Sequence, residues 1–137
     1  MEARVGAGFL KALESIDADA GDPLEPRLRD MIRLRVSHLN GCRSSARLHS
    51  ESLAKAGARP DLISALARPV RQMRDGLVSD GDAAALRLAE VLTDAPRGLE
   101  GEMRDQVGAW FNAAQLGAII EVVAATNAWN RVLRGIE

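Results

Sequence analysis

Three side chains capable of nucleophilic or acid–base chemistry lie in one short segment, residues 42–49. Cys42, the only cysteine in the chain, is followed three residues later by Ser45 and seven residues later by His49. On a helix these spacings place all three side chains on one face. A histidine four residues beyond a hydroxyl is within contact distance of it, as a general base must be. The pattern predicts a nucleophile site with Cys42, Ser45 and His49 on one helix face.

The position of Cys42 at the start of the expected helix favours this interpretation. Backbone N–H groups at a helix N-terminus and nearby arginines stabilise a thiolate. A structural role stays open, because a lone cysteine is commonly a small buried apolar side chain. His38 precedes an Asn-Gly break, so its direction relative to Cys42 is not predicted. One cysteine and two histidines, with no acid at suitable spacing, make a poor metal site, and we expect no metal.

The region around these residues is locally basic. Asp30 is the only acid between Pro26 and Ser50, whereas the same interval holds six arginines: Arg27, Arg29, Arg33, Arg35, Arg43 and Arg47. Such a cluster could bind an anionic ligand, but it is also typical of a solvated face or of ion pairs between subunits. The whole chain has a formal net charge of only −1, so no global field favours nucleic acid or an anionic membrane.

Length and cysteine content limit the class of protein. The 137 residues predict one domain, residues 1–137, with a modest core. A single cysteine excludes an intrachain disulfide, and the N-terminal segment has no long apolar stretch of the kind that a secretory signal needs. No apolar run reaches the ~18 residues of a membrane span. We therefore expect a cytoplasmic protein with no cofactor and with no nucleic-acid or membrane partner.

The elements that must position these residues are helices. No segment alternates with a period of two for long enough to be a strand, while Ala, Leu, Arg and Glu are abundant. An amphipathic helix over 7–16 and a loop over 17–26 come first. Pro26 is suited to the first turn of the next helix, which runs to Leu39. The Asn40-Gly41 break ends it, and another helix runs from Cys42 to Gly57.

The rest of the chain is also predicted to be helical. A short helix starts through Pro60, and Ser79 with Asp82 forms a capping box for the helix over 82–93. Another helical segment covers 99–111. Asn112 and Gln115 form a capping box for a long last helix that runs to about residue 135. The sequence predicts an all-α domain of about six or seven helices, with the last helix in the middle of the bundle.

Residues 28–57, LRDMIRLRVSHLNGCRSSARLHSESLAKAG, resemble the core of the alkyl hydroperoxidase D (AhpD) and carboxymuconolactone decarboxylase family. That core has an acid in a basic helix, an Asn-Gly-Cys break, a second cysteine three residues later and a histidine four residues beyond. Residues 82–93 resemble the family's Ala-rich middle helix, and residues 110–135, with their NAWNR segment, resemble its last helix. We place the core motif at 26–57 and the terminal helix at 112–135.

The resemblance implies a role for each matching position. Asp30 stands where dithiol members have a relay carboxylate, Cys42 where they have the first, resolving cysteine, and His49 where they have the histidine that assists deprotonation. Ser45 occupies the place of the second cysteine, which attacks the peroxide. Family members assemble as trimers or hexamers, so the resemblance also implies a homo-oligomer that buries apolar helix faces between subunits.

Two departures from the family pattern affect the chemistry. Ser45 is a much weaker nucleophile than a thiolate and cannot form a disulfide with Cys42, so the usual dithiol cycle is not available within this chain. Asp30 replaces the usual Glu and draws the carboxylate back by one methylene. Cys42 could still react as a monothiol, forming a sulfenic acid that an external thiol reduces.

Three functions remain open at this point. The first is an AhpD-like thiol-dependent peroxidase with antioxidant activity, an oxidoreductase centred on Cys42. The second is a lyase like the carboxymuconolactone decarboxylases, in which His49 acts as acid or base and arginines hold a substrate carboxylate. The third is a non-catalytic helical oligomer.

Overall fold

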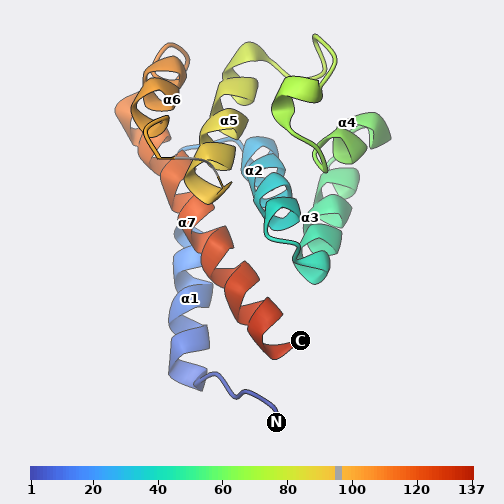
Figure 1. The fold of residues 1–137 in the computed structure, drawn as a ribbon, viewed down its shortest axis with the longest axis vertical. Helices are drawn as coiled ribbons and strands as arrows, with labels where there is room; N and C mark the ends of the chain where they lie inside the picture. Colours follow the sequence, from blue (N-terminus) through green and yellow to red (C-terminus); the bar gives the residue numbers. More distant parts are fainter. Residues whose placement is uncertain (95–96) are drawn as a thin grey trace.

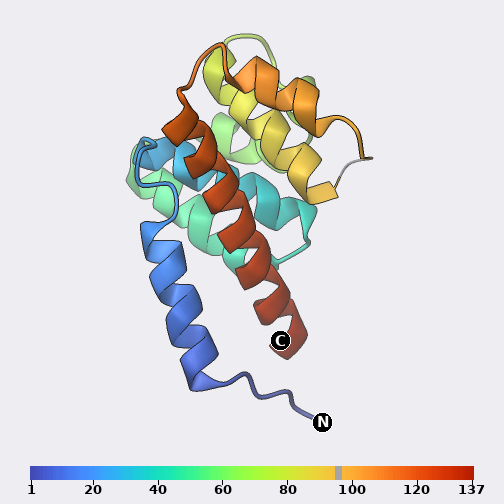
Figure 2. The same ribbon diagram turned by 90° about the vertical axis from the view of Figure 1, so that its left-hand side faces the viewer.

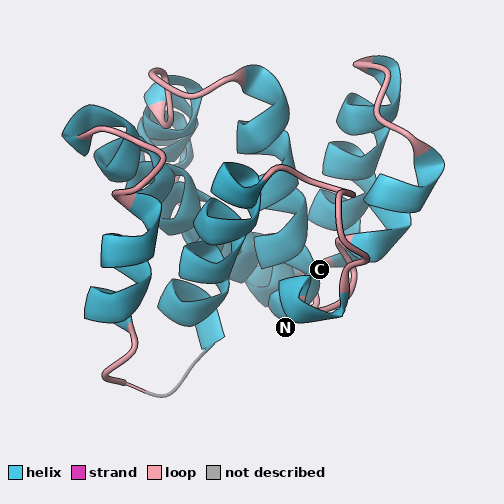
Figure 3. Ribbon diagram, turned by 90° about the horizontal axis from the view of Figure 1, so that it is seen from above, coloured by secondary structure: helices cyan, strands magenta, loops and turns pink. Residues whose placement is uncertain are grey.

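The computed structural model describes residues 1–94 and 97–137, and the regular structure in these ranges is entirely helical (Figure 1). The helices are α1 (Ala7–Asp19), α2 (Pro26–Leu39), α3 (Arg43–Lys55), α4 (Pro60–Ala65), α5 (Asp80–Asp94), α6 (Glu100–Val107) and α7 (Ala113–Ile136), with a 3₁₀ turn at Val70–Gln72. Loops join them, and no strand occurs in the described ranges (Figure 3). The predicted all-α fold is confirmed.

Helix α2 has the bounds that its sequence predicts, with Pro26 in its first turn. Leu28, Met31, Ile32 and Val36 of the expected apolar stripe are buried, whereas Leu39 is half-buried. Further α2 side chains are buried as well, namely Leu34, Arg35 and Ser37. The helix is enclosed on several sides because α3, α5 and α7 all pack against it. The amphipathic pattern of the sequence predicts a single buried face, so it predicts fewer buried residues than α2 has as a central helix.

Helix α1 is longer than predicted, because Asp17 and Asp19 are helical rather than part of a loop. The chain turns at Gly21 instead, where φ is 78°. The Gly21 N–H donates to Glu121 Oε1 of α7 at 3.1 Å. A Cβ at this position would lie 2.4 Å from Val122 Cγ2, so only glycine allows the close approach of this turn to α7. Figure 2 shows α1 lying along α7.

Helix α7 begins with the predicted capping box. Asn112 Oδ1 accepts from the Gln115 N–H at 2.8 Å, and Gln115 Oε1 accepts from the Asn112 N–H at 2.9 Å. The helix packs against α1, α2 and α5. Ile120, Glu121 and Ala124 remain exposed, so α7 is only partly enclosed by the other helices.

Helix α5 begins at Asp80, two residues earlier than the predicted start of the helix at residue 82. The Asp82 N–H donates to Ser79 Oγ at 3.1 Å, which confirms Ser79 as a capping side chain.

Helices α2, α3, α5 and α7 supply most of one buried apolar core, with fully buried side chains that include Met31, Ile32, Leu53, Leu86, Leu88, Ile119 and Val122. This core holds α2 and α3, which carry the predicted site, in a fixed relation to α7.

Candidate functional site

The turn between α2 and α3 fixes the position of Cys42. Gly41 has φ of 63°, and the Cys42 N–H donates back to the Ser37 carbonyl at 3.0 Å. Cys42 is the N-cap residue of α3, with extended backbone angles, and its side chain makes no capping hydrogen bond. It therefore lies immediately before the first helical residue, Arg43, rather than within the first turn.

Amide side chains from α7 hold this turn in place. Asn40 Nδ2 donates to the Oδ1 atoms of Asn127 and Asn130, each at 2.9 Å. Asn130 is fully buried and donates in turn to Ser37 Oγ at 3.2 Å. The Asn-Gly-Cys segment and the NAWNR segment are thus parts of one polar network. Sequence reasoning noted both segments but missed their contact, although two asparagines in an apolar helix were a signal for a buried polar network.

Cys42 lines a hollow of about 550 Å³ on the molecule. Its side chain is only 1% exposed, and Sγ lies 3.8 Å from Ser44 Oγ. The complete lining is Ser37, His38, Gly41, Cys42, Arg43, Ala46, Arg47 and Ser50. No carboxylate is among these described residues, so the two arginines make this hollow electropositive. Burial lowers the pKa of His38, and the charge of Arg35 lowers it further, which favours a neutral imidazole here.

Ser45 and His49 line a different cavity, of about 280 Å³, between α3, α7 and α1. Its other lining residues are Asp17, Leu48, Thr126, Trp129 and Leu133. The structure therefore brings Ser45 and His49 together as predicted but gives Cys42 a separate hollow. The physical reason is the extended backbone of Cys42: a side chain on an N-cap residue does not follow the direction of those in the helix after it.

The environment of His49 favours its neutral form. Burial is the largest influence and lowers the pKa of His49, and the Arg33 guanidinium lowers it further. The carboxylates of Asp30 and Asp17 act in the opposite direction. A neutral imidazole has one nitrogen free to accept a proton, which is the form that a general base requires.

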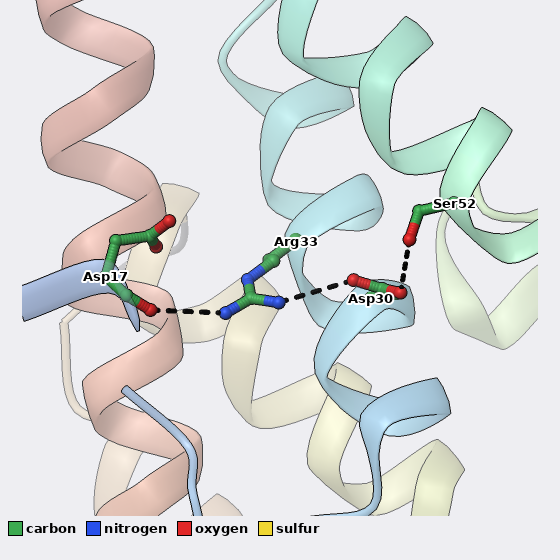
Figure 4. Close-up of polar contacts among 4 residues, drawn as sticks. All are labelled: Asp17, Asp30, Arg33 and Ser52. Carbon is green, nitrogen blue, oxygen red and sulfur yellow. Dashed lines mark hydrogen bonds and ion pairs between the residues drawn. The ribbon is translucent and has the colours of Figure 1, made fainter. Parts of the chain in front are cut away.

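Asp30 belongs to a chain of polar contacts that links three helices (Figure 4). Its Oδ1 accepts from Arg33 Nη1 at 3.3 Å, and its Oδ2 accepts from Ser52 Oγ at 2.8 Å. Arg33 Nη2 also donates to the Asp17 carbonyl at 3.4 Å. No hydrogen bond joins Asp30 to His49 in the described residues. Asp30 thus acts on His49 through space, while its two oxygens are held by α2 and α3.

The basic cluster does not form one surface. Arg35 is buried and donates through Nε to Glu90 Oε2 at 2.7 Å, and the same oxygen accepts from the Val70 N–H at 3.0 Å. Arg33 donates to the Asp30 carboxylate and to the Asp17 carbonyl. The exposed members are Arg27, Arg43 and Arg47, of which the last two line the hollow of Cys42.

Neither a metal centre nor a membrane span is found in the described residues. No three His, Cys, Asp or Glu side chains within 1–94 and 97–137 are grouped in a way that could hold a metal ion. None of the helices in the same ranges is both long enough and apolar enough to cross a bilayer.

The arrangement of helices defines an AhpD-like fold. A structure of a protein of unknown function from Agrobacterium tumefaciens, linked in its description to the antioxidant defence protein AhpD, superposes with a TM-score of 0.81 at 22% identity, covering 96% of this chain and 89% of that one. An uncharacterized peroxidase-related protein from Silicibacter sp. TM1040 gives a TM-score of 0.81 at 21% identity, covering 96% of this chain and 69% of that one. At sequence identities this low, the similarity to the two structures establishes the fold of the chain alone.

The sequence itself matches the model of the carboxymuconolactone decarboxylase family over residues 5–94, and the chain belongs to that family. A curated relative, the uncharacterized protein YdfG of Bacillus subtilis (strain 168), is 27% identical over 105 residues. This alignment covers 76% of the present chain and 69% of YdfG. The predicted family resemblance is confirmed.

Proposed function

We propose that this protein is an AhpD-like redox protein in which Cys42 is the single peroxide-reactive thiol. The observation that carries the proposal is the setting of Cys42, which lies at the N-terminus of α3 in a hollow lined by Arg43 and Arg47. Such a hollow gives a small peroxide a place beside Sγ, and its two guanidinium groups can stabilise the negative charge that forms on the departing oxygen. Family membership and the AhpD-linked and peroxidase-related structural neighbours support the same redox class.

The reaction proceeds through one sulfur. The Cys42 thiolate attacks an oxygen of a hydroperoxide, the O–O bond breaks, and the products are a Cys42 sulfenic acid and an alkoxide that takes a proton to become an alcohol. An external thiol then forms a mixed disulfide with Cys42 and releases water. A second external thiol restores the Cys42 thiol and leaves as a disulfide with the first. Ser45 supplies no sulfur, so the reductant must come from outside the chain.

Trapping the sulfenic acid tests the proposal directly. We expect brief treatment with hydrogen peroxide followed by dimedone to give one adduct, at Cys42, detected by peptide mass spectrometry. Cys42→Ser is the control and should give no adduct, since Cys42 is the only cysteine. Folded wild-type protein that forms no adduct, under conditions in which the unfolded protein does, would contradict the proposal.

A second variant tests the missing thiol. Ser45→Cys restores the cysteine pair of the family, and we expect it to raise peroxide turnover several-fold with a dithiol reductant, measured as loss of peroxide. Ser44→Cys is the matched control, because it adds a thiol at the neighbouring position without recreating the spacing. Equal turnover in the two variants would show that the rest of the dithiol machinery is absent.

An acid–base function at His49 is the second candidate. It is favoured by the cavity that holds His49 and Ser45 together and by the lowered pKa of His49. The carboxylate substrate of a decarboxylase would also need a cation in that cavity. The described residues that line it include no Arg or Lys. We therefore rank the lyase below the redox function. If Cys42 forms no sulfenic acid and Ser45→Cys gains no peroxide turnover, the non-catalytic oligomer becomes the favoured interpretation.

A further inference from the structure

The cavity beside His49 is lined by a buried polar side chain that no described residue pairs with. Thr126 of α7 is 3% exposed, and its Oγ1 is buried with no hydrogen-bond partner in the described residues. Ser45, which is 5% exposed, and His49 line the same cavity and add a hydroxyl and an imidazole to its wall. Buried polar groups are normally paired, and an unpaired one carries a free-energy cost that a ligand can remove.

The remaining lining indicates what kind of ligand fits. Leu48, Trp129 and Leu133 make most of the wall apolar. Asp17 contributes a carboxylate, and no Arg or Lys of the described chain lines the cavity. The Arg33 guanidinium acts on His49 from outside the lining, so an anion in the cavity would have no cation in direct contact, whereas a neutral molecule would bury apolar surface without needing one.

The size of the cavity limits the ligand further. Its volume of about 280 Å³ exceeds the ~150 Å³ of a cavity that accepts benzene and lies just below the ~300 Å³ at which pockets for drug-sized ligands begin. One ring, or an alkyl chain of similar bulk, with a short substituent fits this volume.

We propose that this cavity is a binding site for a small neutral organic molecule with one carbonyl or hydroxyl oxygen, held by the hydroxyls of Ser45 and Thr126 and by His49. The apolar part of the molecule packs against Trp129 and Leu133. The site is distinct from the hollow of Cys42, so it requires no thiol chemistry and stands whether or not the redox proposal does.

Three probes of similar size test the proposal: acetophenone, which is neutral with a carbonyl, benzoate, which is anionic, and ethylbenzene, which has no oxygen. The indole N–H signal of Trp129 in an NMR titration reports on the cavity. Trp110, which is 57% exposed and lines a different pocket, is the reference within the same molecule. We expect acetophenone to shift the Trp129 signal saturably, ethylbenzene to bind more weakly, and benzoate to leave the signal unchanged.

Variants identify the polar contacts. Thr126→Val keeps the shape of the side chain and removes its hydroxyl, and Ser45→Ala does the same at the other wall. Each should weaken acetophenone binding by about three- to ten-fold, the usual range for one neutral hydrogen bond, and leave ethylbenzene binding unchanged. Ser44→Ala is the matched control, because the Ser44 hydroxyl bonds Glu137 outside the cavity. Cys42→Ala should also bind acetophenone normally, which separates this site from the redox proposal.

Three outcomes would overturn the proposal: no saturable shift of Trp129 with acetophenone, benzoate binding as tightly as acetophenone, or unchanged acetophenone affinity in both hydroxyl variants. If Thr126→Val fails to fold, as its NMR dispersion would reveal, Ser45→Ala alone decides.

Discussion

Cys42 and Ser45 are three residues apart in the chain, but their side chains line different cavities. In a dithiol protein the two positions must meet, because one sulfur attacks the peroxide and the other then attacks the first. With serine at position 45 that requirement disappears, and the two cavities can serve separate ligands. The replacement of one sulfur by oxygen at position 45 thus removes a nucleophile. It also leaves the cavity of Ser45 free to bind a ligand that takes no part in thiol chemistry.

The burial of Cys42 predicts selectivity by reagent size. Its side chain is 1% exposed at the wall of a hollow, so a small oxidant can reach Sγ more easily than a bulky disulfide reagent can. We expect folded protein to react with hydrogen peroxide while reacting with an aromatic disulfide such as Ellman's reagent more than about ten-fold more slowly than unfolded protein. Stopped-flow absorbance with and without denaturant measures the second rate. Equal rates in the two states would mean that Sγ is open to large reagents.

The histidines predict how stability depends on pH. Because burial lowers the pKa of His49 in the folded state, the unfolded state, with a pKa of about 6.5, binds more protons as the pH falls. The contribution of neutral His49 to the free energy of unfolding is fully present above the unfolded-state pKa. It is lost as the pH falls from there towards the folded-state pKa of His49. His38 acts in the same direction.

We therefore expect the free energy of unfolding, from urea titrations, to fall between pH 7.5 and pH 5, and to fall less in His49→Gln. Lys11→Gln, a change at an exposed residue of α1, is the control and should keep the wild-type dependence. A His49→Gln variant with the full wild-type loss would show that His49 ionises equally in both states.

At the scale of elements, Gly21 decides how α1 meets α7. Gly21→Ala combines a positive φ of 78° with a Cβ 2.4 Å from Val122 Cγ2, so we expect a loss of about 2–4 kcal/mol in the free energy of unfolding. Gly57→Ala is the matched control, with φ of 86° and no atom within 4 Å of the new Cβ, and should cost about 1–2 kcal/mol. Urea denaturation compares them, and equal losses would rule out the steric contribution.

The elements also show where sequence reasoning succeeds. Pro26, the Asn40-Gly41 break and the Asn112–Gln115 capping box are local signals, and the helices that they delimit were predicted closely. The end of α1 was misplaced because it depends on contact with α7, a hundred residues away, through Gly21 and Glu121. The site follows the same rule: the pairing of Ser45 with His49 is local, whereas Thr126, Trp129 and the asparagines of α7 come from tertiary packing.

At the scale of the whole molecule, several large apolar side chains are left on the surface. Ile16 is 58% exposed, and Phe9 on the same helix and Ile120 on α7 are exposed as well. A groove lined by residues of α1 and α7 lies between these helices. Exposed apolar surface of this kind is typical of faces that associate.

We expect a trimer or hexamer, as the family resemblance implies, with a mass of three or six times the 14.7 kDa chain in light scattering at micromolar concentration. Ile16→Glu should weaken this assembly by placing a charge in the apolar face. Lys11→Glu adds the same side chain at another exposed position of α1 and should leave the assembly unchanged. A wild-type protein with the mass of one chain would exclude the prediction.

The amide network that joins Asn40 to Asn127 and Asn130 has a consequence for the order in which the protein forms. Its partners are separated by 87 and 90 residues, and the α7 partners lie beyond residues 5–94, which match the family model. On a ribosome the helices that carry Cys42 and His49 emerge well before α7 does. Until α7 docks, the amide of Asn40 lacks its partners, and one wall of the His49 cavity does not exist. A nascent chain therefore carries Cys42 and His49 before this site is finished, and the docking of α7 completes it.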